Sequence, residues 1–165
     1  MVVVHDTLAT RPAAVRAPTR RYAARRNAIV ASAVDELNRK GVRGMTLGGV
    51  AARLGLVPTG VIYYFRSKEE LAAACFMRAI ERFDALIGEG AAAGADDRAR
   101  IVGFVRAYFD FKRRASAGEV EKVAVFNDVR ALGSAPVNTA YIDMFRHARG
   151  LIDGPPDALL PRLAR

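Results

Sequence analysis

The chain has 165 residues, of which 52% are apolar and 26% charged, and its formal net charge is +9. This composition excludes a disordered chain, and the lack of any apolar run of about 18 residues excludes a membrane-spanning helix. The single cysteine, Cys75, cannot form an internal disulfide and the N-terminus has no secretory signal pattern, so we expect a soluble protein of the reducing cytoplasm.

The positive charge is concentrated in the first part of the chain. Residues 1–70 hold 12 Lys and Arg against 5 Asp and Glu, whereas residues 71–165 hold 14 against 12. No acid occurs from Thr7 to Val34, a stretch with six arginines. Because clustered cations attract phosphates or an anionic membrane surface, we expect a polyanionic partner. Residues 1–19 show no helical or strand period and are predicted to form a mobile, disordered basic arm.

Three helices are expected between residues 20 and 66. Apolar residues recur at intervals of three and four in the first helix, which Gly41 is expected to end. Thr46 can cap a short second helix that ends at Gly55. Pro58 suits the first turn of a third helix.

The fourth and fifth helices are predicted from their N-terminal caps. Ser67-Lys68-Glu69-Glu70 is a capping box, which starts a helix at about Lys68. The small and apolar neighbours of Cys75 in this helix favour a buried thiol over a redox sensor. We expect the helix to end in a flexible, glycine-rich stretch at residues 88–94. Asp96 or Asp97 can then cap the fifth helix.

Glycines also separate the remaining predicted helices. A sixth is expected over Val120–Leu132 and a seventh over Pro136–Ile152. No convincing strand alternation occurs, so the expected fold class is all-α. No catalytic constellation or metal-ligand spacing is evident, because the only histidines are His5 and His147 and no phosphate-binding loop is present. We therefore expect a protein that is not an enzyme and needs no metal or cofactor.

Residues 47–66 have the pattern of a helix pair that recognises DNA. Ala51 is the small residue required where the two helices cross, and Gly55 allows the turn between them. The residues expected to face inward are Val50, Leu54, Leu56, Val61 and Tyr64. Those expected to face outward are Val57, Pro58, Thr59, Ile62, Tyr63 and Arg66. A helix-turn-helix places its second helix in the major groove, with N-terminal residues at the base edges.

In the order of these parts the sequence resembles the TetR family of transcriptional regulators. The resemblance covers roughly residues 25–71. It is carried by the first helix with Ile29, Ala33 and Leu37, and by the segments Gly41–Thr46, Val50–Leu56 and Tyr63–Leu71. In that family a three-helix DNA-binding head precedes a helical domain that dimerises and holds a small ligand. The resemblance thus implies a ligand-responsive repressor that binds a palindromic operator in double-stranded DNA as a homodimer.

The resemblance also implies which residues contact DNA. Thr46 and Lys68 each lie where a helix begins, so free amides and positive charge suit a phosphate. By analogy with the arms of other helix-turn-helix proteins, Arg20 and Arg21 are expected in the minor groove. The contacts implied on the third helix are Pro58, Thr59, Gly60, Tyr63 and Tyr64, the last of which stands where the family usually has histidine.

Three departures from the family pattern have structural consequences. Val57 replaces the usual serine cap, which leaves Thr59 as the alternative cap, and Gly60 costs about 1 kcal/mol relative to alanine within a helix. Ile62 replaces a common tyrosine. We expect a short recognition helix that orders on DNA. Family members are usually longer and end in two helices that form the dimer, so the chain is expected to be a truncated or shortened member.

The resemblance further implies an effector cavity among the later helices. It would be mainly apolar with few polar groups, which favours a small apolar or aromatic effector. The candidate lining residues are Phe104, Tyr108, Phe126, Asn127, Tyr141 and Phe145. Ordinary packing between helices remains an alternative role for these aromatic side chains.

The expected organisation is a disordered basic arm at 1–19, a helix-turn-helix domain at 20–66, and a shortened ligand-binding and dimerisation domain at 67–165. One alternative class is a nonspecific basic DNA-binding or membrane-surface protein in which the arm carries the affinity. Another is a helical interaction module that does not bind DNA.

Overall fold

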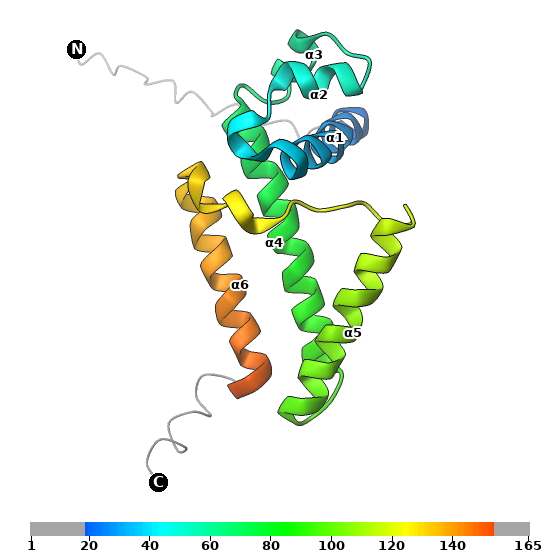
Figure 1. Cartoon of the computed structure of the whole chain (residues 1–165), viewed down its shortest axis with the longest axis vertical. Coiled ribbons are helices and arrows are strands. Elements are labelled where there is room, and N and C mark those ends of the chain that lie inside the picture. The colour runs from blue at the N-terminus through cyan, green and yellow to red at the C-terminus, as the bar shows by residue number, and fades with distance from the viewer. Residues whose placement is uncertain (1–18, 154–165) are drawn as a thin grey trace, which may run out of the picture.

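The computed structural model describes residues 19–153, and this part of the chain is helical without strands (Figure 1). The expected all-α class is confirmed. The elements are α1 (Arg20–Gly44), α2 (Leu47–Arg53), α3 (Pro58–Ile62), α4 (Lys68–Ala92), α5 (Asp97–Ser116), two 3-10 turns η1 (Phe126–Asp128) and η2 (Arg130–Leu132), and α6 (Ala135–Asp153). Most of the predicted basic arm lies outside the described residues.

The head, residues 20–66, is built on α1. The buried residues of α1 recur at three and four because those intervals fall on one face of an α-helix; they are Ile29, Val30, Ala33, Val34 and Leu37. Gly41 has φ of 69°, which interrupts the helical conformation of α1 at the expected stop. Side chains of α2 and α3 pack on this face and complete a core shared with the start of α4.

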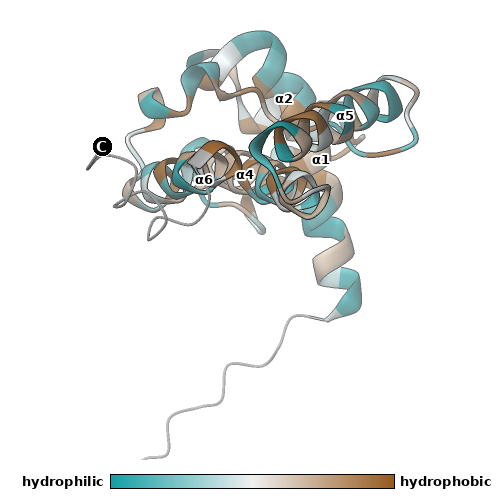
Figure 2. Cartoon of the chain, turned by 90° about the horizontal axis from the view of Figure 1, so that it is seen from below, coloured by the Kyte–Doolittle hydropathy of each residue, from teal (hydrophilic) through white to brown (hydrophobic). Residues whose placement is uncertain are grey.

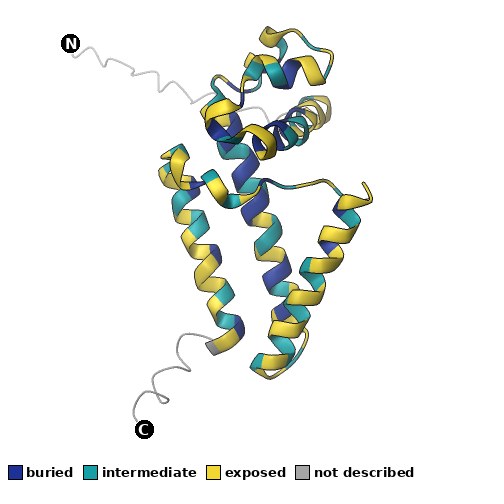
Figure 3. Cartoon of the chain, viewed as in Figure 1, coloured by how far each residue is buried: buried dark blue, intermediate teal, exposed yellow. Residues whose placement is uncertain are grey.

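The helix α4 is common to both halves of the molecule (Figure 3). Its capping box is confirmed: the Ser67 hydroxyl accepts from the Glu70 amide at 3.1 Å. The Glu70 carboxylate accepts from the amide of Arg66, one residue before the cap, at 2.8 Å. The first turns of α4 place Leu71 and Phe76 in the core of the head, whereas Leu86 lies in a second cluster with α5.

The predicted flexible break at residues 88–94 is wrong, because α4 continues to Ala92. The glycines permit close contact between α4 and α5. A Cβ on Gly90 would lie 2.6 Å from the Cβ of Phe104, and one on Gly103 would overlap the Cβ of Ala93. The helix is maintained because its packing against α5 outweighs the low helix propensity of glycine.

The predicted sixth helix at Val120–Leu132 is also wrong. Residues 121–125 have no helical conformation, and only the short turns η1 and η2 follow. The backbone of this segment bonds to a side chain of α1 instead of forming helical hydrogen bonds: the Val123 carbonyl accepts from Asn38, and the Val125 amide donates to it. The predicted seventh helix is confirmed as α6.

The helices α5 and α6 lie on either side of α4 (Figure 2). Both bury apolar residues in clusters that include residues of α4: Phe111 of α5 clusters with Leu86, and Met144 of α6 belongs to the main core cluster. Both also expose large apolar side chains, including Phe109, which is 65% exposed. The half of the molecule beyond the head is therefore less deeply packed than the head.

Candidate nucleic-acid interface

The corner between α2 and α3 is closed by backbone hydrogen bonds at Ala51. Its carbonyl accepts from the amides of Leu54, at 3.0 Å, and Leu56, at 2.9 Å. Gly55 has φ of 63°, a conformation that side chains with a Cβ rarely adopt. Ala51 is fully buried, as its predicted role at the helix crossing requires. These features fix the angle between α2 and α3.

The predicted inward and outward faces are confirmed by burial. Val50 and Val61 are fully buried, and the other three inward residues, Leu54, Leu56 and Tyr64, are half-buried. All six outward residues are exposed, including Val57 at 67% and Tyr63 at 72%. An exposed valine and an exposed tyrosine at the two ends of a short helix are not explained by the core of the described chain. They form a surface available to a partner.

The helix α3 is short and lacks a side-chain cap. It spans the five residues Pro58–Ile62, and the preceding Val57 is extended, with φ of −77° and ψ of 150°. Thr59 lies inside the helix and makes no capping hydrogen bond. The expected short recognition helix is therefore present, and the alternative cap at Thr59 is not.

Thr46 and Lys68 lie where α2 and α4 begin, and both are close to the end of α1. Thr46 caps α2, since its hydroxyl accepts from the Gly49 amide at 3.0 Å. The Lys68 ammonium donates to the carbonyl of Arg43 at 3.2 Å and approaches that of Val42 at 3.5 Å. Lys68 therefore bonds the end of α1 to the start of α4, in addition to any phosphate it contacts.

Tyr22 and the adjacent pair Tyr63 and Tyr64 form one aromatic cluster at the end of α3. The ring of Tyr22 on α1 lies 4.8 Å from that of Tyr64 and 6.1 Å from that of Tyr63, and the rings of Tyr63 and Tyr64 lie 5.0 Å apart. The sequence motif indicates Tyr63 and Tyr64, but not Tyr22. The rings of Tyr22 and Tyr64 therefore pack against the exposed ring of Tyr63.

The structure places Arg20 and Arg21 in the first turn of α1 rather than on an extended arm. Thr19 caps this turn, since its hydroxyl accepts from the Tyr22 amide at 3.2 Å. Both arginines are exposed. Further along the same helix the guanidinium of Arg26 lies 4.6 Å from the centre of the Phe65 ring, where it contributes to packing.

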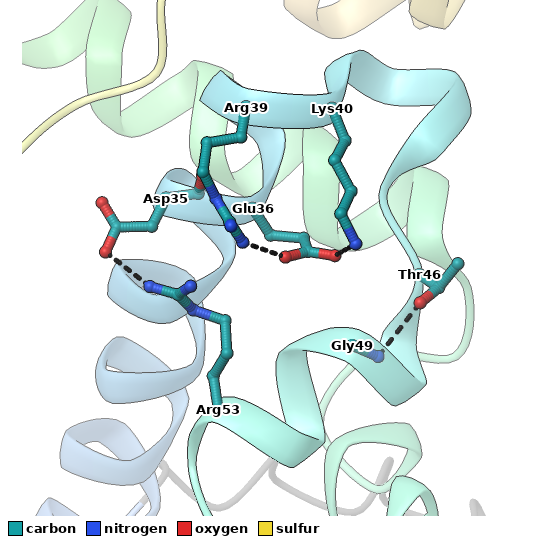
Figure 4. A network of polar contacts seen from close by, with 7 residues as sticks. All are labelled: Asp35, Glu36, Arg39, Lys40, Thr46, Gly49 and Arg53. Atoms are coloured by element: carbon teal, nitrogen blue, oxygen red, sulfur yellow. Dashed lines mark hydrogen bonds and ion pairs between the residues drawn. The ribbon is translucent and has the colours of Figure 1, made fainter.

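A buried acid lies behind α2, and the sequence motifs do not indicate it (Figure 4). Glu36 is 2% exposed, and its two oxygens accept from Lys40 at 2.6 Å and Arg39 at 2.7 Å. The hydrogen bond from Lys40 lowers the pKa of Glu36, opposed by burial and assisted by the charge of Arg39.

Glu36 is also in close contact with the start of α2. A Cβ on Gly49 would lie 2.6 Å from a Glu36 oxygen, so only glycine fits there without a shift. On the exposed side of the same pair of helices, Arg53 bonds to Asp35 at 2.9 Å. These contacts hold α2 against α1 and so fix the orientation of α3.

A cavity of about 390 Å³ lies beyond the head, between α5 and residues 122–127. It is lined by three of the six predicted ligand-binding residues, Tyr108, Phe126 and Asn127. The other three, Phe104, Tyr141 and Phe145, lie outside its lining but belong to the same set of contacting aromatic rings.

The wall of this cavity is bonded to the head. The Asn38 amide group donates to the Val123 carbonyl at 3.0 Å, and its oxygen accepts from the Val125 amide at 2.9 Å. Nearby, the Asp128 carboxylate accepts from the Val42 amide at 3.1 Å. More than 80 residues separate each pair along the chain, so sequence pattern alone does not reveal them.

Comparison with known families matches residues 29–75 to the model described as bacterial regulatory proteins, tetR family. The matched residues include α2, the turn, α3 and the capping box of α4. No match to a curated protein was found. Among residues 19–153, no helix has the length and apolar character needed to cross a membrane, and no cluster of three potential metal ligands occurs.

Proposed function

From its membership of the TetR family of DNA-binding transcriptional regulators, we propose that this chain is a ligand-responsive repressor that binds a palindromic operator as a homodimer. In this proposal residues 20–66 contact DNA, and residues 67–165 bind the effector and dimerise. The proposed place of action is the cytoplasm, where bacterial chromosomal DNA lies.

The observation that carries the proposal is the exposed face of α3. Pro58, Thr59 and Tyr63 lie on the solvent side of a helix whose angle is fixed by the buried contacts of Ala51 and Val61. A helix held in this way can enter the major groove with its N-terminal residues at base edges. We propose that Pro58, Thr59, Gly60, Tyr63 and Tyr64 supply these contacts.

Contacts to the DNA backbone are proposed for residues around α3. Thr46 lies at the N-terminus of α2 and Lys68 at that of α4, where free amides and positive charge favour phosphate. Arg20 and Arg21 are proposed for the minor groove, from the first turn of α1. In a homodimer two copies of α3 would occupy successive major grooves about 34–36 Å apart.

The proposed response to an effector follows from the bonds between the cavity wall and the head. A ligand that prefers a conformation in which residues 123–128 are displaced would shift α1 through Asn38 and Asp128. Because the dimer selects one spacing of its recognition helices, such a ligand would weaken DNA binding by its differential affinity for the two conformations.

Selection from a random duplex DNA pool tests the proposal. The full chain is incubated with the pool at near-physiological salt, retained DNA is sequenced, and the selection is repeated at higher salt. We expect an enriched palindrome that persists, because binding through phosphates alone weakens steeply as salt rises. Retention without enrichment, lost at higher salt, would contradict the proposal and favour the nonspecific basic protein.

Variants connect any enriched site to α3. Tyr63→Ala should weaken operator binding about tenfold, since one good contact is equivalent to about 1–3 kcal/mol. Phe109→Ala is the matched control, because it removes another exposed aromatic ring, 65% exposed, from α5 outside the head. Equal affinities of the two variants would contradict the assignment of Tyr63.

Deleting residues 1–18, which retains the Thr19 cap, should leave the sequence preference intact.

A further inference from the structure

We propose that the cavity between α5 and residues 122–127 binds a small aromatic monoanion, whose ring lies among aromatic side chains and whose charged group lies between Lys112 and Lys122. The existence of this site is independent of DNA binding. Its role as an effector site rests on the proposed function.

The walls of the cavity suit an aromatic ring. Phe83, Tyr108, Phe111 and Phe126 line it from α4, α5 and η1. Phe83 connects two of them, with its ring centre 5.7 Å from that of Tyr108 and 5.1 Å from that of Phe126. The volume of about 390 Å³ lies within the range of small-molecule sites. Rings at several angles offer both faces and edges to a bound aromatic group.

The charge of the cavity lining is positive. Lys112 and Lys122 both line it, and no acidic residue does. Within the described chain neither lysine forms an ion pair, whereas Arg113 and Arg114, which follow Lys112 in the sequence, are paired with Asp110 and Glu119. Glu121, the acid next to Lys122, pairs instead with Arg78 at 2.7 Å. Among the described residues the two lysines have no acidic partner, so both can pair with a bound anion.

Neutral polar groups complete the lining. They are Asn38, which belongs to α1 of the head, Ser116 and Asn127. The Asn38 side chain is already bonded to the backbone of residues 123 and 125, which are themselves part of the wall. A ligand seated against this wall contacts the same segment that α1 holds, so binding and the position of the head are physically connected.

Two probes that differ in charge test the ligand class. Isothermal titration of the full chain compares 2-naphthoate with 2-naphthamide, which have the same ring system. We expect naphthoate to bind about tenfold more tightly, since a charge-assisted contact contributes roughly that factor. The advantage should disappear in the Lys112→Gln/Lys122→Gln double variant and persist in Arg106→Gln, which removes an exposed charge from α5 outside the lining.

A second pair of variants locates the ring. Phe126→Ala should weaken both probes, whereas Phe109→Ala, which removes an exposed ring outside the lining, should weaken neither. Thermal melting by circular dichroism verifies that each variant is folded. Equal affinity for the two probes, an equal effect of Arg106→Gln, or no binding of either probe would overturn the proposal. Because these titrations contain no DNA, failure here is distinct from failure to enrich an operator.

Discussion

Glu36 is an acid in a position where most side chains are apolar. It is 2% exposed, and its carboxylate is balanced by Lys40 and Arg39. A buried carboxylate is tolerated when its charge is compensated and its oxygens are bonded. Because Lys40 and Arg39 are partly exposed, solvent screens their charges and weakens their attraction to Glu36.

Glu36→Gln should lower the free energy of unfolding by about 1–2 kcal/mol at pH 7. The pKa of Glu36 is lowered in the folded chain from an ordinary value of 4.5, so its stabilisation is present above that value. It is lost as pH falls through the lowered pKa. Urea unfolding of both proteins from pH 7 to pH 3 should show the difference shrinking below about pH 4.5. A difference that grows with acid would contradict this account.

The Cys75 thiol is buried, as its small and apolar neighbours in the sequence predict. It is 0% exposed, and burial raises the pKa of its thiol to about 12. We expect an aromatic disulfide reagent at pH 8 to react with Cys75 only after unfolding in denaturant, since the thiolate is the reactive form. Rapid reaction with the folded chain would contradict the buried position.

At the scale of single elements, two glycines of α4 should respond oppositely to alanine. Gly90→Ala should destabilise the chain by about 1–3 kcal/mol, because its Cβ would lie 2.6 Å from Phe104 and force α5 away. Gly88→Ala should stabilise it by about 0.5–1 kcal/mol, since a Cβ there meets nothing within 4 Å. Thermal melting compares the two, and the same sign for both would contradict the close helix contact.

The recognition helix allows a similar test at its cap. Val57 already has the extended conformation of an N-cap residue, so Val57→Ser should add the missing hydrogen bond without a change in backbone. We expect a gain of about 0.5–1 kcal/mol in the free energy of unfolding. Val57→Ala, which provides no acceptor, is the control. Circular dichroism should also show a smaller gain of helix on operator binding for Val57→Ser than for the natural sequence.

Elements with strong local signals could be predicted from the sequence. The capping box at Ser67, the stop at Gly41 and the faces of α2 and α3 follow from spacing and cap chemistry. The C-terminal end of α4 and the structure of residues 120–132 depend on contacts with distant segments. Helical Gly90 is in close contact with Phe104, and the amide of extended Val125 donates to Asn38. Neither partner can be identified from local periodicity.

The residues of the candidate site likewise divide into those that the sequence predicts and those that only the fold reveals. The outward position of Tyr63 follows from helical spacing, whereas its neighbour Tyr22 lies on another helix and has no motif. Only half of the predicted ligand-binding residues line the cavity, because aromatic content indicates packing but not which rings surround a space. Lys112 and Lys122 stand ten positions apart in the sequence, and only the fold shows that both lie by the same cavity.

At the scale of the whole molecule, Asn38 should control how strongly a bound effector changes operator affinity, rather than operator affinity itself. Asn38→Ala removes both bonds to the cavity wall but leaves α3 intact. We expect operator affinity within about threefold of the natural chain and a weaker effect of 2-naphthoate on that affinity, because two of the bonds that join residues 123–128 to α1 are removed while the Asp128–Val42 bond remains. Fluorescence anisotropy with labelled operator measures both. The control is Arg106→Gln, which changes an exposed side chain of α5 and should retain the full effect of 2-naphthoate.

The uneven burial of the helices also determines how the molecule opens. The helix α5 buries only Phe111 and Ala115, whereas α1 buries seven residues, among them Ile29 and Val34. Segments with few buried contacts open locally at lower free energy than a well-packed core. Amide hydrogens of α5 should exchange with deuterium well before those of α1. The wall around the cavity can then loosen and admit a molecule while the DNA-binding half keeps its fold.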